Sequence, residues 1–96
     1  MHREKVIACL QAHREDMVQF HIRSLSLFGS VARDEARADS DVDLLVEFEG
    51  SPSFLDYMDA KFALEEWLGV SVDLVTTTSL KPALRPQVER EAFRVA

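Results

Sequence analysis

The chain has 96 residues, of which 47% are hydrophobic and 29% charged, which is the size and composition of one globular domain, residues 1–96. The formal net charge of −6 disfavours nucleic acid as a partner, because such binding depends mainly on Lys and Arg that neutralise phosphates. One cysteine allows no internal disulfide, and no apolar run approaches the ~18 residues that span a membrane, so we expect a cytoplasmic protein without membrane contact.

The first half of the chain is predicted to form a helix, a strand and a second helix. Over residues 3–20, apolar side chains recur near helical spacing between charged ones, which is typical of an amphipathic helix. Residues 22–28 are rich in β-prone side chains, so we expect a short strand there. Residues 31–37 place acids early and an arginine late, which favours a helix that Ser30 would cap.

The second half is predicted to alternate strands with helices. Residues 38–40 read as a turn before a strand over residues 41–48. Ser53 would cap the next helix, which runs from residue 54 to Gly69, a natural residue for a helix end. A third strand is expected over residues 70–75, and a short terminal helix over residues 87–93.

Apolar and polar side chains alternate along the two later strands. Asp41 and Asp43 point to the same side of one strand, and Asp73 lies between Val72 and Leu74 on the next. We therefore expect an α+β (α/β) fold, in which a small mixed β-sheet carries helices mainly on one face. The three aspartates would line a polar groove on the other face.

The pair Gly29 and Ser30, between a strand and a helix, suits a bound phosphate. The first N–H groups of a helix lack partners within the helix and carry the positive end of its dipole. Arg33 would lie close to the same phosphate, in the first turn. Each feature also has a purely structural explanation: Gly-Ser turns cap many helices, and Arg33 could instead pair with Asp34 or Glu35.

The aspartates suit a magnesium site. Asp41 alone fits a solvated turn, but Asp43 and Asp73 lie inside β-prone runs, where aspartate is disfavoured and costly to bury without a partner. Two carboxylates at spacing i, i+2 on a strand share a face and can hold hard divalent cations. A phosphate binder joined to a metal binder by a short segment predicts a site for a metal–nucleoside triphosphate.

The run GSVARDEARADSDVDLLVEF, from Gly29 to Phe48, resembles the signature of the DNA polymerase beta-like nucleotidyltransferase superfamily. That signature is Gly-Ser, ten residues, Asp-any-Asp, and a third aspartate on a later strand, which Asp73 matches. The resemblance extends over nearly the whole chain and is greatest to the minimal nucleotidyltransferases, which consist of the catalytic domain alone. It implies the polymerase beta-like nucleotidyltransferase fold.

The resemblance also implies roles for single residues. Gly29 and Ser30 would bind the triphosphate of ATP with support from Arg33, while Asp41, Asp43 and Asp73 would hold two Mg²⁺ ions. Asp73 would also help to deprotonate the attacking hydroxyl.

One departure from the family is Asp34, where close relatives often have glycine, and its charge could weaken nucleotide binding. The other is the absence of the helical domain that larger members use to hold nucleotide or acceptor, so a partner would complete the acceptor site.

In this family, stand-alone domains commonly act as antitoxins of a small all-helical HEPN ribonuclease toxin, and some transfer AMP from ATP onto a tyrosine of that toxin. The resemblance therefore implies a protein adenylyltransferase with a HEPN-type partner. Two alternatives stay open: an antitoxin that works only by complex formation, and a nucleotidyltransferase acting on a small molecule. The missing second domain argues against the small molecule, although a homodimer could build the same pocket across its interface.

Overall fold

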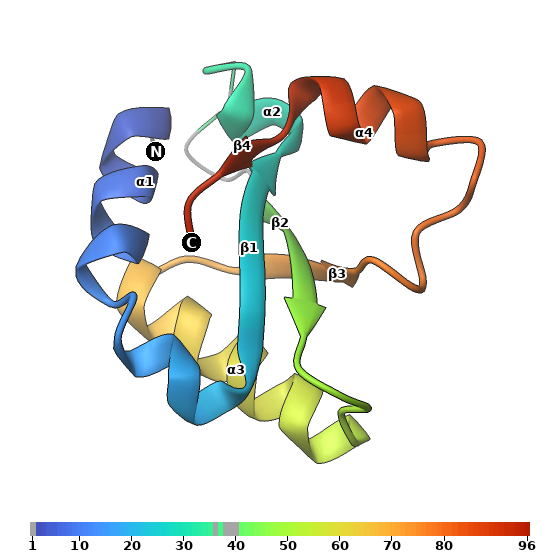
Figure 1. The fold of residues 1–96 in the computed structure, drawn as a ribbon. Helices are drawn as coiled ribbons and strands as arrows, with labels where there is room; N and C mark the ends of the chain where they lie inside the picture. The colour runs from blue at the N-terminus through green and yellow to red at the C-terminus, as the bar shows by residue number, and fades with distance from the viewer. Residues whose placement is uncertain (1, 36, 38–40) are drawn as a thin grey trace.

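The computed structural model describes residues 2–35, 37 and 41–96, and its centre is a four-stranded sheet in the order β3-β2-β1-β4. The strands are β1 (Ile22–Phe28), β2 (Val42–Phe48), β3 (Val72–Thr76) and β4 (Phe93–Arg94). β1 is antiparallel to β2 and β4, whereas β2 and β3 are parallel, so the sheet is mixed as predicted. Figure 1 shows the two long strands β1 and β2 side by side at the centre of the molecule.

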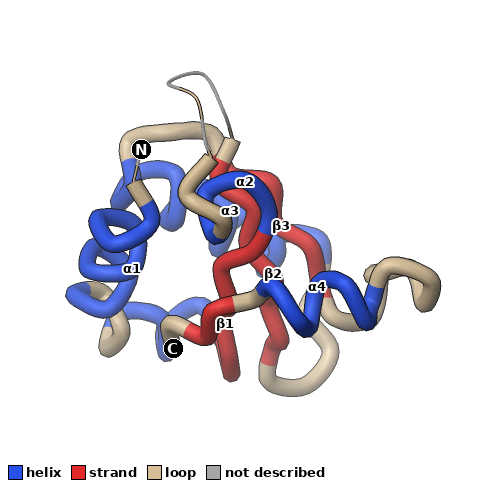
Figure 2. The backbone as a smooth tube through the Cα atoms, turned by 90° about the horizontal axis from the view of Figure 1, so that it is seen from above, coloured by secondary structure: helices blue, strands red, loops and turns tan. Residues whose placement is uncertain are grey.

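Two helices, α1 (Arg3–Ala12) and α3 (Phe54–Leu68), cover one face of the sheet (Figure 1). Their side chains share one core with the inward residues of the strands, which confirms helices packed mainly on one face. Figure 2 shows the last helix, α4 (Arg85–Glu91), on the far side of the strands from α1. No helix in the described part of the chain is long and apolar enough to cross a membrane.

The strand faces follow the predicted alternation. Along β2, buried Val42, Leu44, Val46 and Phe48 alternate with half-buried residues, among them Asp43. On β3, Val72 and Leu74 are buried, whereas Asp73 is exposed. The carboxylates therefore lie on the face that α1 and α3 leave open.

Helix α3 begins and ends where the sequence predicts. Ser53 accepts a hydrogen bond from the backbone N–H of Asp56, and the Asp56 carboxylate accepts one from the Ser53 N–H, which forms a capping box. Gly69 ends the helix with a φ of 72°, a left-handed conformation that glycine adopts without steric cost.

The predicted helix over residues 3–20 is wrong in its second half. α1 ends at Ala12, and a short 3₁₀ helix, η1 (Asp16–Phe20), follows. A continuous helix of that length would run about 27 Å, whereas the seven-residue strand β1 spans about 23 Å. The break turns the chain back so that Met17 enters the same core as Leu10, while His13 at the break stacks on Trp67 at 4.4 Å.

The second helix also differs from the prediction over residues 31–37 with Ser30 as its cap. α2 (Gly29–Ala32) begins at Gly29, so Ser30 lies inside its first turn. The helix ends early because Asp34 takes a left-handed φ of 59°. The Glu35 N–H then donates to the Ser30 carbonyl at 2.8 Å and the Asp34 N–H to the Val31 carbonyl at 3.0 Å, the pattern of a Schellman motif.

The other boundaries shift by smaller amounts. β2 and β3 each begin later than predicted, and the predicted turn over residues 38–40 lies outside the described residues. α4 starts earlier, at Arg85, with Pro86 in its first turn, where a missing N–H costs nothing. Phe93 belongs not to this helix but to β4, which pairs with Leu27 of β1 and was not predicted.

Candidate functional site

The strand register brings three distant segments to one end of the sheet. Asp43 of β2 lies opposite Phe28, the last residue of β1, and opposite Asp73 of β3. Gly29 follows Phe28 directly, so the predicted phosphate-binding turn and two of the predicted metal ligands are neighbours. Arg33 is close enough for its charge to lower the pKa of Asp43.

Gly29 allows the backbone to approach Asp43. Its φ is +75°, which residues with a side chain rarely adopt, and a Cβ atom added there would collide with Oδ2 of Asp43. Glycine is therefore required twice, for its conformation and for space. The result is a bare backbone turn beside a carboxylate, with Ser30 half-buried next to it on α2.

The Asp43 carboxyl lies close to the negative charges of Asp73 and Asp41. Burial first, and then the nearby charges of Asp73 and Asp41, together raise the pKa of this carboxyl to about 6, and Arg33 acts in the opposite direction. The charge of Arg33 therefore does not balance the negative charge of these carboxylates. A divalent cation would relieve the repulsion, so the donor set fits the magnesium ions expected from the sequence.

The three aspartates are not equally placed. Asp43 and Asp73 are register partners with a direct side-chain interaction, whereas exposed Asp41 acts on Asp43 through its charge. Within residues 2–35, 37 and 41–96, no three His, Cys, Asp or Glu side chains already surround a common point as metal ligands would. Joint ligation by all three would therefore require side-chain rearrangement when the cation binds.

Arg33 is held by two carboxylates. Its Nε donates to Glu35 at 3.2 Å and its Nη1 to Glu91 of α4 at 3.1 Å. The hydrogen bond to Glu35, together with the charge of Glu91, raises the pKa of Arg33. The sequence suggested the pairing with Glu35, but it carried no signal for Glu91, which comes from a distant helix.

Asp34 contacts the start of the chain, at His2 and Arg3. Its Oδ1 accepts a hydrogen bond from the backbone N–H of Arg3 at 3.4 Å and lies 3.6 Å from the His2 ring. Its left-handed φ also explains why glycine suits this position, since the C′ residue of a Schellman motif has that conformation.

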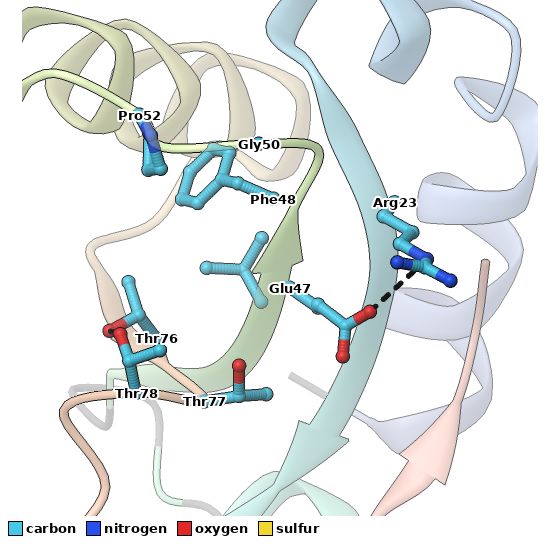
Figure 3. A pocket seen from close by; sticks show the side chains of 9 residues that line it. Arg23, Glu47, Phe48, Gly50, Pro52, Thr76, Thr77 and Thr78 are labelled. Carbon is cyan, nitrogen blue, oxygen red and sulfur yellow. Dashed lines mark hydrogen bonds and ion pairs between the residues drawn. The ribbon is translucent and has the colours of Figure 1, made fainter.

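A cavity of about 430 Å³ lies at the C-terminal ends of β2 and β3, away from Asp43 and Asp73 (Figure 3). Thr76, Thr77 and Thr78 form one wall, and Glu47, which is ion-paired with Arg23 at 3.3 Å, lies across from them. Val46 also lines the cavity, and the rise of a strand places this residue about 10 Å from Asp43. The cavity is thus separate from the carboxylate cluster.

Comparison with known proteins gives consistent matches over nearly the whole chain. Residues 10–95 match the family described as nucleotidyltransferase domain. The protein adenylyltransferase MntA of Thermococcus cleftensis is 42% identical over 93 residues, which cover 96% of this chain and 94% of that protein.

Solved structures share the fold. One described as a minimal nucleotidyltransferase aligns with a TM-score of 0.84 at 46% identity, over 97% of this chain and 95% of the other. A toxin–antitoxin structure with AMP-PNP aligns with a TM-score of 0.68 at 20% identity, over 85% and 71% of the two chains. A tri-AMPylated Shewanella oneidensis HEPN toxin in complex with its MNT antitoxin gives a TM-score of 0.60 at 20% identity, over 90% and 71%.

Proposed function

Because the chain belongs to the nucleotidyltransferase domain family, we propose that it transfers AMP from ATP onto a hydroxyl group of a partner protein. The observation that carries this proposal is the meeting of Gly29, Asp43 and Asp73 at one end of the sheet. A bare backbone turn beside paired carboxylates can hold a phosphate chain and its cations together. The similarity to a protein adenylyltransferase supports a protein as the acceptor.

In this proposal, each residue of the site has a separate task. The turn at Gly29 and Ser30 cradles the triphosphate, and Arg33 contributes a positive charge at its distal end. Asp41, Asp43 and Asp73 would hold two magnesium ions. These ions, when bound, neutralise charge on the phosphate oxygens during an in-line displacement.

The acceptor hydroxyl approaches from the open face of the sheet. Asp73 is exposed at that face and can accept the hydroxyl proton. The hydroxyl oxygen then bonds to the α-phosphorus, the bond from the α-phosphorus to the oxygen bridging it to the β-phosphorus breaks, and pyrophosphate leaves. The product is a phosphodiester between AMP and the acceptor.

We infer that the acceptor is a HEPN-type toxin. The related fold found beside an AMPylated HEPN toxin supports this, as does the net charge of −6, which suits a basic ribonuclease surface. Exposed apolar side chains on α3, namely Phe54, Leu55 and Phe62, are further candidates for contact with a protein, either the toxin or a second copy in a homodimer. We place this reaction in the cytoplasm.

The test uses ATP labelled on its α-phosphate and a HEPN-type toxin as acceptor. We expect the wild-type chain to label the toxin in the presence of magnesium, and the double variant Asp41→Asn/Asp43→Asn to transfer no label. The matched control is Glu49→Gln, which removes an exposed charge just after the end of β2, away from both the site and α3, and should transfer normally.

Transfer that survives in the double variant would refute these catalytic roles. A growth-rescue assay distinguishes neutralisation by AMP transfer from neutralisation by complex formation alone. If the folded double variant still neutralises the toxin, complex formation rather than transfer is the basis of neutralisation.

A further inference from the structure

We propose that Glu91 is a positioning residue that holds the Arg33 guanidinium ready for the phosphate chain of the nucleotide. This inference rests on the proposed function. It assigns a task to α4, a helix that contributes none of the expected ligands.

Glu91 is itself firmly held. Glu91 is the last residue of α4 and is 28% exposed, whereas Glu35, the other partner of Arg33, is 67% exposed. The two residues after Glu91 are held by backbone contacts. The Ala92 N–H donates to the Val88 carbonyl at 2.8 Å, and Phe93 pairs with Leu27 of β1. Glu91 is therefore the better anchored of the two carboxylates.

Arg33 keeps N–H donors for a ligand while it contacts Glu91. A guanidinium has five N–H donors. The Nε–H donates to Glu35, and one N–H of Nη1 donates to Glu91. Among the described residues, these two contacts leave the second N–H of Nη1 and both N–H groups of Nη2 for a phosphate. Glu91 therefore orients the guanidinium without using all of its donors.

The contact with Glu91 should strengthen nucleotide binding by ordering Arg33 in advance. An arginine that is already ordered loses less side-chain freedom when it binds a ligand. Ordering one such side chain on binding weakens affinity by roughly two- to tenfold. Removal of the Glu91 carboxylate should therefore weaken binding of a triphosphate by that factor, and only where Arg33 is present to be oriented.

The experiment measures dissociation constants of Mg²⁺–ATP and of AMP by titration calorimetry on the isolated chain. Glu91→Gln keeps the shape of the side chain but removes its charge. We expect it to weaken Mg²⁺–ATP roughly two- to tenfold and to leave AMP unchanged, because AMP lacks the distal phosphates. Glu89→Gln, an exposed residue of the same helix, is the matched control and should change neither constant.

A double-mutant cycle decides between orientation and a general effect of charge. In an Arg33→Gln background, Glu91→Gln should have no further effect on ATP binding. Tighter ATP binding by Glu91→Gln would overturn the proposal, since the carboxylate would then compete with phosphate. Equal losses in both backgrounds, equal losses for ATP and AMP, or no loss at all would overturn it as well.

Failure of the proposed function gives a different result from failure of this inference. If the wild-type chain does not bind Mg²⁺–ATP, the nucleotide site itself is contradicted, and the role of Glu91 with it. If the wild type binds and Glu91→Gln binds equally well, only the role of Glu91 is rejected. Melting temperatures of all variants verify that each one is folded.

Discussion

Replacing Asp43 with asparagine should make the metal-free protein more stable. The Asp43 carboxyl has a pKa of about 6 in the folded chain, against an ordinary value of 3.8, because it is partly buried beside Asp73 and Asp41. At about 1.4 kcal/mol for each pH unit between the two values, ionisation costs about 3 kcal/mol. Solvent screening at this half-buried position reduces the cost to about 1–2 kcal/mol.

The sign and the pH window follow from the raised pKa. Between pH 3.8 and about 6 the folded state binds more protons at Asp43 than the unfolded state, so the stability of the wild type falls as the pH rises through this range. Asparagine cannot ionise. Asp43→Asn should therefore gain little at pH 4 and its full 1–2 kcal/mol above pH 7, which raises the midpoint by roughly 5–15 °C in a domain of this size.

The assay is thermal unfolding followed by circular dichroism, with EDTA present, at several pH values from 4 to 8. Asp59→Asn serves as the control, because it removes a carboxylate that lies outside the cluster. A gain that is absent at pH 8, or equally large at pH 4 and pH 8, would refute the idea that Asp43 carries uncompensated charge. The same variant should lose magnesium-dependent ATP binding, so that stability and function change in opposite directions.

Three further substitutions test other parts of the structure. Gly29→Ala should lower the free energy of unfolding by more than the ~1–2 kcal/mol of a left-handed residue, because its Cβ also displaces the Asp43 carboxylate. Chemical denaturation would measure this loss. An unchanged free energy of unfolding would contradict the close approach of Gly29 to Asp43. Asp34→Gly and Asp34→Asn both remove the charge, but only glycine relieves the left-handed strain, so the melting temperature should be higher for Asp34→Gly. ATP titrations should show less than about a threefold change in affinity for both variants. A larger gain in affinity would mean that the Asp34 charge reaches the phosphates. Ser53→Ala should cost about 1 kcal/mol by removing the side-chain acceptor for the Asp56 N–H, and an unchanged midpoint would show that the capping box is not stabilising.

The sequence was sufficient for features that depend on local pattern. The alternation along residues 42–48 gives the buried face of β2 directly, and the Ser53 and Gly69 caps of α3 depend on residues at fixed offsets. The placement of Asp43 and Asp73 on one face follows from the same alternation. The register that makes them direct neighbours does not, because it is set by packing over the whole β2–α3–β3 unit.

Features set by distant contacts or by backbone angles were missed. β4 has two residues, too few for any alternation to be seen, and its pairing depends on where α4 ends. The early end of α2 depends on a left-handed Asp34, a conformation that helix propensity does not reveal. Glu91 contacts Arg33 from 58 residues further along the chain, and no spacing rule connects them.

The order of strands in the sheet also has a consequence for how the protein folds. Gly29 directly follows β1, and Asp43 lies on β2, the antiparallel neighbour of β1 that is close to it in sequence. Asp73 arrives only after α3 has crossed over to bring β3 alongside β2. Parallel pairing of this kind requires closure of a long loop and is slow compared with local pairing. A partly folded chain would thus hold the Gly29 turn and the carboxylates of Asp41 and Asp43, but not that of Asp73. Binding of magnesium and ATP should then select fully folded molecules, which makes the substrate itself a stabiliser of the finished fold.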